Sequence, residues 1–335
     1  MWRDIYLSLA RAEPAMQVGV LFVTLFGLLA VATVATLRVG LRDDLSPLGR
    51  AQLAQWRRDL SAAWLGAVVF WVAWISRPWG ATLLFAVISF LALREFITLT
   101  PTRRSDHRTL ALAFFVVLPA QYLLAAGQWF DLFSVFVPVY VFAALPIVSV
   151  LAGDAQQFLA RNARIQWGIM VCVFGLSHAS ALLILDLPGF GGRGAFLVFF
   201  LVATTLAGHV GYVVVSQRPQ RRPRGEGPPA RGIDKRFSYT ALGLGTALAA
   251  LVGVLLGWIT PFGWLQAALM AALAGASGIV GALIMQALKI EAGVRVWGNQ
   301  PALTGAVGLL DRIAPLAFSA PLFFHTAYGY FRPAG

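Results

Sequence analysis

The sequence predicts an all-α protein, a polytopic transmembrane helical bundle of about ten spans with its amino terminus outside. Hydrophobic residues make up 59% of the 335 residues and charged residues only 12%, with a mean hydropathy of +0.75. Soluble globular domains are far less apolar. Apolar runs of about 18 residues or more, long enough to cross a bilayer as a helix, recur along the chain. Basic residues gather in every second loop between these runs.

Five spans are predicted in the amino-terminal half. A polar loop, 38–59, follows the first span, and a tight turn at Arg77 and Pro78 joins the second to the third. The basic segment TPTRRSDHR follows the third span. Pro138 and Pro146 interrupt the fifth, which membrane helices tolerate where neighbouring groups satisfy the freed carbonyls. The five spans are 16–39, 60–75, 79–99, 110–126 and 130–151.

Five more spans complete the bundle. A polar stretch, 153–164, is interpreted as a short amphipathic helix before the sixth span, and the Pro-, Gly- and Arg-rich stretch 217–236 as a flexible loop. Gly275, Gly278 and Gly281 give the ninth span a face of small residues, typical of close helix packing. The five spans are 166–185, 195–215, 237–259, 264–288 and 313–331.

The distribution of basic residues predicts the orientation. Five loops hold 20 of the 26 Lys and Arg residues, and the loops between them are nearly free of both. By the positive-inside rule these five face the cytoplasm. We therefore expect a multi-pass protein of the inner (cytoplasmic) membrane, with spans 1–99 as an amino-terminal part and 100–335 as the main domain. The basic loops are 38–59, 100–108, 152–165, 217–236 and 289–312.

Several classes of function are excluded by the composition. Cys172 is the single cysteine, so the chain has neither an internal disulfide nor a CxxC metal site. The net charge of +12 follows from the basic loops and gives no reason to expect nucleic acid as a partner. The glycine-rich pieces GFGGRG and GLGTALAALVG are not phosphate loops, because neither is followed by GK[ST].

Two kinds of ionisable residue lie within predicted spans. Glu95, beside Arg94 near the cytoplasmic end of the third span, is either a residue that lines a site or a structural anchor. His178 and His209 lie inside the sixth and seventh spans. A single intramembrane histidine is more often a hydrogen-bonded packing residue than a ligand.

Charged residues also gather where the ninth span ends and the tenth begins. They lie within the stretch GASGIVGALIMQALKIEAGVRVWGNQPALTGAVGLLDRIAPLAFSAPLFFH, which covers 275–325. Charges at the ends of two membrane helices predict a site at the membrane face, on the cytoplasmic side. The charged residues are Lys289, Glu291, Arg295, Asp311 and Arg312.

From about Ser89 onward the chain resembles the phosphatidate cytidylyltransferases, or CDP-diacylglycerol synthases, of a bacterial branch. QALKIEAGVRVWGN and GLLDRIAPLAFSAPLFFH occupy the place of the pattern S-x-x-K-R-x-x-x-x-K-D-x-G…P-G-H-G-G-x-x-D-R-x-D, and SFLALREFITLTPTRRSDHR and LAGHVGYV extend the resemblance upstream. It implies the reaction of CTP with phosphatidate to give CDP-diacylglycerol and pyrophosphate in phospholipid synthesis, with Mg²⁺ as cofactor. Such a reaction needs several carboxylates around the metal ions.

This chain departs from the pattern at most of those carboxylates. His209 and Ala282 stand where the family has aspartates in two spans, and Ala314 replaces the last aspartate of the signature. PALTGAVG replaces the PGHGG loop, and Ile290 replaces an arginine. Asp311 is the one metal-binding acid of the pattern that remains.

The resemblance assigns candidate roles to the residues that remain. Asp311 and Lys289 are the catalytic candidates, and Asp311 is also a weak metal ligand. The candidates for substrate binding are Arg312, Arg295, His209 and Glu95.

Three functions are open. The chain either still makes CDP-diacylglycerol from CTP with a weakened Mg²⁺ site, or is a pseudoenzyme without a cofactor that binds phosphatidate or another anionic lipid or regulates a partner enzyme. A lipid transporter is the third alternative, although the chain lacks the paired, interrupted helices of symmetric transporters. The missing carboxylates favour the pseudoenzyme. A homodimer is open in each case.

Overall fold

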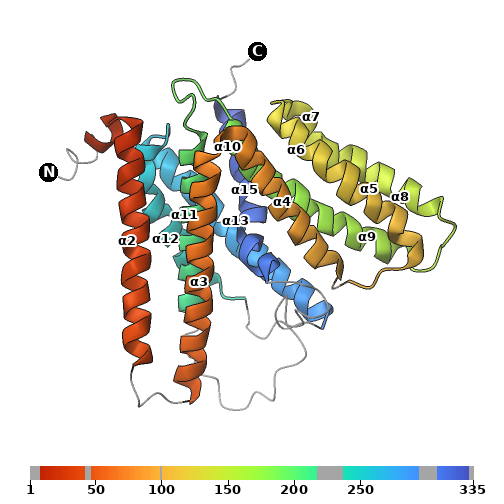
Figure 1. The fold of residues 1–335 in the computed structure, drawn as a ribbon, viewed down its shortest axis with the longest axis horizontal. Helices are drawn as coiled ribbons and strands as arrows, with labels where there is room; N and C mark the ends of the chain where they lie inside the picture. The colour runs from red at the N-terminus through yellow and green to blue at the C-terminus, as the bar shows by residue number, and fades with distance from the viewer. Residues whose placement is uncertain (1–7, 42–46, 99, 217–236, 294–307, 332–335) are drawn as a thin grey trace. The chain divides into compact units, whose positions relative to one another are not determined.

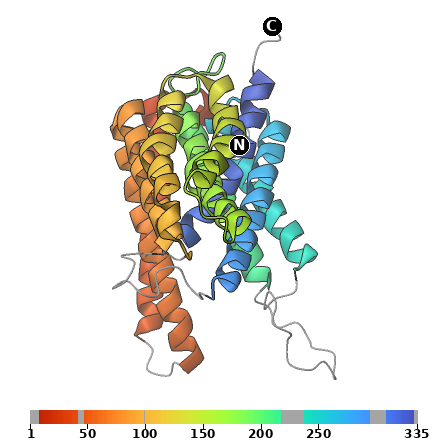
Figure 2. The same ribbon diagram turned by 90° about the vertical axis from the view of Figure 1, so that its right-hand side faces the viewer.

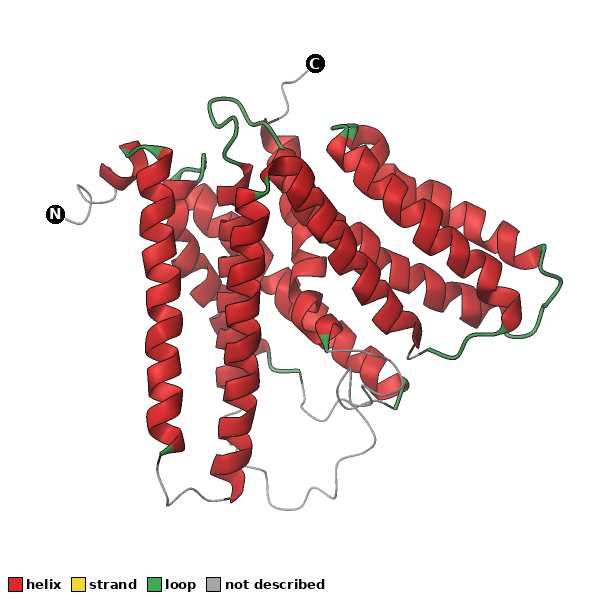
Figure 3. Ribbon diagram, viewed as in Figure 1, coloured by secondary structure: helices red, strands yellow, loops and turns green. Residues whose placement is uncertain are grey.

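The computed structural model is all-α in the part that it describes, with helices joined by turns and no strand (Figure 3). The described residues are 8–41, 47–98, 100–216, 237–293 and 308–331. Eight helices among them are long and apolar enough to cross a membrane. The predicted all-α membrane bundle is therefore confirmed, while ten spans and an outer amino terminus stay predictions.

The first of two compact units, residues 1–77, contains two long helices. α2 (Pro14–Gly40) and α3 (Pro47–Ile75) pack against each other, and the Trp64 indole N–H donates to the Thr33 hydroxyl over 3.1 Å. Trp64 is half-buried, and an indole N–H removed from water needs such an acceptor, so this bond contributes to the packing of the two helices.

The start of α3 corrects the predicted loop 38–59. The helix begins at Pro47, so Arg50 and Arg57 lie on it rather than in a loop. Proline is pre-organised for the first helical turn, and no other proline follows before Ile75. Residues 47–59 therefore form the first part of α3, and the stretch between the two helices is shorter than predicted.

The second unit, residues 78–335, contains the remaining helices. The division after Arg77 places α4 in this unit. The predicted amino-terminal part, 1–99, and main domain, 100–335, stay predictions. α11, α12, α13 and α15 pack against one another in a bundle (Figures 1 and 2). The helices are α4 (Arg77–Thr98), η1 (Arg104–Asp106), α5 (His107–Leu112), η2 (Ala113–Val117), α6 (Leu118–Ala126), α7 (Phe130–Val135), η3 (Phe136–Val141), α8 (Phe142–Val150), α9 (Phe158–Ile169), η4 (Met170–Gly175), α10 (Leu176–Ile184), α11 (Gly194–Ser216), α12 (Tyr239–Leu256), η5 (Gly257–Ile259), α13 (Trp264–Glu291) and α15 (Leu309–Phe331).

The helix of the predicted sixth span begins earlier in the chain than the sequence indicated. Residues 153–164 were expected to form a separate amphipathic helix, but α9, η4 and α10 form one continuous helix from Phe158 to Ile184. No proline lies between those two residues, so nothing ends the helix where the polar stretch meets the apolar one. The polar stretch is the first part of the span itself.

Contacts at the helix ends agree with the predicted alternation of loops. Two of the predicted cytoplasmic loops meet where the Ser105 hydroxyl donates to the Asp154 carboxylate over 2.8 Å. Two turns that were predicted to lie on the other side meet where the Gln128 side chain donates to the Ile184 carbonyl over 3.3 Å. The side of the membrane on which each set lies stays a prediction.

Pro146 lies inside α8, where its missing N–H frees the carbonyl of Phe142 four residues earlier. The side-chain amide of Gln166 on α9 donates to that carbonyl over 3.0 Å. A neighbouring helix thus satisfies the freed carbonyl, as the sequence predicted for prolines in this span.

Three helices contain a π-helical segment, η2, η3 and η4. A π-helical turn interrupts the regular hydrogen-bond pattern of an α-helix, and buried side chains donate to one carbonyl within such a segment and to one close to another. Gln121 donates to the Phe133 carbonyl just before η3 over 3.3 Å, and Ser89 donates to the Cys172 carbonyl within η4 over 2.6 Å. Polar residues in these spans therefore stabilise the backbone of adjacent helices.

The small-residue face predicted for the ninth span is confirmed as a packing surface. A Cβ built on Gly208 of α11 would lie 2.8 Å from the Cα of Gly275 on α13, and one on Gly275 would overlap the Cβ of Ala249 on α12. Backbones approach this closely only where side chains are absent. These residues thus hold α11, α12 and α13 together.

Candidate functional site

The candidate site lies where the ends of α4 and α13 meet the first turn of α15. Glu95, near the end of α4, is only 4% exposed. Its Oε2 accepts the backbone N–H of Leu309 over 3.1 Å. The first N–H groups of a helix have no partner within the helix, and a carboxylate there also interacts favourably with the helix dipole. Glu95 therefore caps α15 from another helix.

Lys289 and Asp311 form an ion pair beside this cap. The Lys289 Nζ, in the last turn of α13, lies 2.6 Å from the Asp311 Oδ1, in the first turn of α15. The two side chains are 16% and 29% exposed, so water screens the pair only in part. The pair therefore joins α13 to α15. The sequence predicted a loop over 289–312, but the two ends of that stretch are helical in the structure.

Arg312 is exposed next to this pair. Together with Asp311 it lies near enough to Glu95 for their charges to interact. Arg295 lies outside the described residues. The structure therefore brings together four of the six predicted site residues, namely Glu95, Lys289, Asp311 and Arg312.

His209 is not part of this cluster. It follows Gly208, which contacts Gly275, and Lys289 comes fourteen residues later on α13. A rise of 1.5 Å per residue places Lys289 about 20 Å further along the helix axis. His209 therefore cannot act on a group held by Lys289 and Asp311.

The positions that lack the family acids are filled by packing. A Cβ on Gly281 would lie 2.6 Å from the Cβ of Phe318, and Ala314 is 1% exposed within the apolar core. Ala282, next to Gly281, is half-buried. Ala314 therefore contributes to the apolar core at a position where the resemblance implies an oxygen ligand.

The described residues do not fit a Mg²⁺ site of the kind that the resemblance implies. Mg²⁺ is held by several oxygen ligands, and nowhere in the described part do three or more His, Cys, Asp or Glu side chains lie close enough to share a metal ion. Asp311 is paired with Lys289, and Glu95 accepts from the backbone of α15. Each carboxylate thus already has a partner within the chain.

The sequence missed a second charged cluster, at the start of α9. The Arg161 side chain is 3% exposed and contacts Asp106 over 3.0 Å and Asp154 over 2.6 Å. Hydrogen bonds from the Ser105 hydroxyl and the Gln156 N–H, with Arg161, lower the pKa of Asp154 to about 2. In the sequence, the loops 100–108 and 152–165 each contain one acid beside two or three arginines, a pattern too common to indicate this cluster.

The sequence also missed the partner of His178. This residue is fully buried in α10, and its Nε2 lies 3.2 Å from the Nε2 of His325 on α15. Residues 147 positions apart give no sequence signal of contact. The expectation that His178 is a hydrogen-bonded packing residue is confirmed in part, since its Nδ1 lies 2.6 Å from the Phe174 carbonyl.

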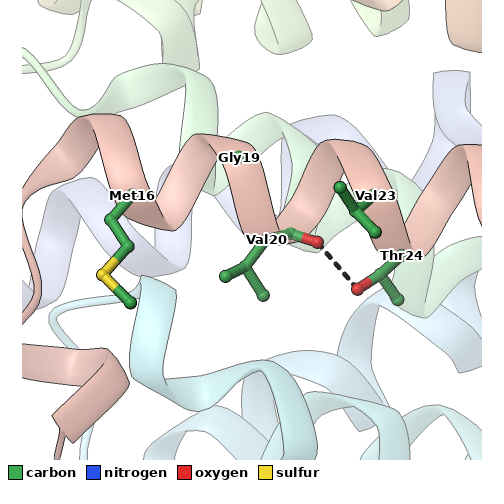
Figure 4. A pocket seen from close by; sticks show the side chains of 5 residues that line it. All are labelled: Met16, Gly19, Val20, Val23 and Thr24. Carbon is green, nitrogen blue, oxygen red and sulfur yellow. Dashed lines mark hydrogen bonds between the residues drawn. The ribbon is translucent and has the colours of Figure 1, made fainter.

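An apolar depression on α2 has no side chain that could act as an acid or a base. Its lining contains no ionisable side chain, and the Thr24 hydroxyl donates to the Val20 carbonyl of the same helix over 2.7 Å (Figure 4). A hydroxyl bonded in this way is satisfied within its helix. The lining residues are Met16, Gly19, Val20, Val23 and Thr24.

Comparisons with known proteins show which family the chain resembles over most of its length. A family model described as "Cytidylyltransferase family" matches residues 56–215 and 240–330. The chain is also 38% identical over 265 residues to "Uncharacterized protein YnbB" of Escherichia coli (strain K12), a match that covers 78% of this chain and 84% of that protein. Both the cap residue Glu95 and the pair of Lys289 and Asp311 lie inside the matched residues.

Proposed function

The chain belongs to the cytidylyltransferase family, and we propose that it is a pseudoenzyme of this family that binds an anionic lipid, phosphatidate, without transferring a nucleotide to it. The ion pair of Lys289 with Asp311 carries the proposal. It occupies the remaining signature acid with a cation of the same chain. A carboxylate neutralised in this way is a poor ligand for a metal ion that transfer chemistry requires.

The proposed lipid binding depends on the positive charge of Arg312, which remains after Lys289 and Asp311 have paired with each other. Arg312 is exposed in the first turn of α15, next to a pair whose own charges cancel. A guanidinium matches the oxygens of a phosphate with two parallel hydrogen bonds. A phosphate monoester can carry a second negative charge near neutral pH, which a diester headgroup cannot, so the monoester attracts this cation more strongly. A cation at the end of membrane helices lies at headgroup depth, so a phosphatidate headgroup can reach it from the bilayer.

The lipid arm of the test measures thermal unfolding in nanodiscs. Phosphatidylcholine discs with added phosphatidate are compared with discs that contain the same fraction of phosphatidylglycerol. A ligand that binds the folded state raises its midpoint temperature. We expect a saturable rise with phosphatidate that Arg312→Gln removes and that Arg193→Gln, which changes a cation on the loop between α10 and α11, leaves in place.

The outcomes separate the alternatives. An equal rise with both lipids, or one that Arg312→Gln leaves unchanged, contradicts recognition of phosphatidate at this cluster. Incorporation of CTP into lipid, with Mg²⁺ and purified protein, contradicts the pseudoenzyme and supports a catalytic family member with a rearranged site. Both measurements use the full chain.

A further inference from the structure

The histidine pair on α10 and α15 is separate from the charged cluster. His325 comes fourteen residues after Asp311 on the same helix, which places it about 20 Å further along the axis. α10 and α15 contact each other along this part of the second unit (Figure 1). The proposed lipid function therefore leaves this pair without a role.

The hydrogen bond of His178 defines its tautomer. Its Nδ1 lies 2.6 Å from the carbonyl oxygen of Phe174, one turn earlier on the chain. A carbonyl only accepts, so the Nδ1 carries the proton and the Nε2 has a lone pair that can accept a hydrogen bond or bind a metal ion. Histidines that bind metal ions commonly donate their second N–H to a carbonyl in this way, which fixes the ring.

Aromatic rings hold the His178 imidazole in place. The ring centroids of Phe133, Phe174 and Phe324 lie 4.6, 4.4 and 5.3 Å from its own. His325, in contrast, is exposed. The pair therefore combines a fixed, buried nitrogen with one that is accessible from the surface of the unit.

We propose that the His178 and His325 Nε2 atoms form a two-histidine site for a late first-row divalent metal ion such as Zn²⁺ or Cu²⁺. The nitrogens are 3.2 Å apart. Two imidazoles on a tetrahedral ion, each about 2.0–2.1 Å from it, place their nitrogens about 3.3 Å apart. Imidazole favours these ions over Mg²⁺.

Metal binding here requires no loss of a proton. In the metal-free pair His325 donates its Nε2–H to the His178 lone pair, and neutral imidazole can carry the same proton on Nδ1 instead. Both Nε2 lone pairs then face the ion. No third His, Cys, Asp or Glu joins the two histidines within the described part of the chain, so the ion keeps open positions for water or a small ligand.

The test uses calorimetric titration of the purified protein with Zn²⁺ and the paramagnetic resonance of bound Cu²⁺, with a purification tag that contains no histidine. We expect one Zn²⁺ per chain and nitrogen splitting from two imidazoles. His325→Ala should weaken Zn²⁺ binding at least tenfold and leave splitting from one imidazole. His107 is an exposed histidine on another helix, α5, so His107→Ala should change neither the Zn²⁺ affinity nor the Cu²⁺ spectrum.

Because His325 is exposed, its substitution is compatible with folding, and unchanged helix content by circular dichroism checks this. His178→Phe, which fills the same aromatic surroundings, provides a second variant that should also lose the two-nitrogen signal. Zn²⁺ binding that survives His325→Ala, or no binding by the folded wild-type protein at micromolar Zn²⁺, overturns the proposal and leaves a plain hydrogen bond between two histidines.

Discussion

The Lys289 ammonium lies 2.6 Å from the Asp311 carboxylate and joins the last turn of α13 to the first turn of α15. The resemblance in the sequence implies that Asp311 is the one metal-binding acid of the family signature that remains. The structure gives that acid a partner within the chain. The cluster therefore has the charges of a site that stabilises two helix ends, with Arg312 left exposed beside it.

A double-mutant cycle should detect this pair in the stability of the protein. Lys289→Met and Asp311→Asn are combined, and thermal unfolding in detergent is followed by circular dichroism. Both side chains are partly exposed, so we expect a coupling energy of about 1 kcal/mol. Strictly additive effects of the two substitutions would show that the pair contributes nothing to folding.

The cap on α15 predicts a graded loss of stability at Glu95. Glu95→Ala removes the acceptor of the Leu309 N–H and should cost about 1–2 kcal/mol. Glu95→Gln keeps an acceptor oxygen without the charge and should cost less. The same unfolding measurement compares the two, and equal losses would mean that the hydrogen bond is not what stabilises the helix.

Close helix packing predicts opposite effects for two glycine substitutions. A Cβ on Gly175 would overlap the backbone carbonyl of Ala317, which cannot move aside, so Gly175→Ala should destabilise the protein by more than about 1 kcal/mol. Gly243 on α12 has nothing within 4 Å of a built Cβ. Gly243→Ala should be neutral or stabilising by up to about 1 kcal/mol, because alanine favours the helix. Thermal unfolding of both variants checks the contrast.

The Asp154 cluster predicts a loss of stability in acid. Hydrogen bonds from Ser105 and the backbone lower the pKa of Asp154 from 3.8 to about 2. The stability that this carboxylate contributes is present above a pH of about 4 and is lost as the pH falls toward about 2. Asp154→Asn should flatten that part of the curve of unfolding temperature against pH. A wild-type slope in the variant would assign the acid sensitivity to other groups.

The sequence predicted the helices better than the contacts between them. Long apolar runs predicted the helices in the regions where the structure has them, because length and composition alone determine that signal. The predicted start of α3 and the predicted start of the span that contains α9 were wrong. In both cases the prediction placed the end of a helix at a polar stretch, although no proline or capping sequence lies between that stretch and the apolar residues. Helices continue through polar residues wherever the backbone allows it.

The candidate site was predicted in part, for a similar reason. The signature placed Lys289 and Asp311 in one region, and the structure pairs them. Their pairing, the cap by Glu95 and the contact of His178 with His325 depend on how helices from distant parts of the chain pack. Periodicity along a single helix carries no information about which residue faces it from another.

The incorporation of CTP, labelled at its α-phosphate, into lipid tests the central claim most directly. Purified protein in phosphatidate-containing nanodiscs is incubated with labelled CTP and Mg²⁺, next to an active phosphatidate cytidylyltransferase as positive control. We predict no labelled lipid above background from the wild type or from Asp311→Ala, although phosphatidate still stabilises the wild type. Robust labelling by the wild type that Asp311→Ala abolishes would contradict the pseudoenzyme.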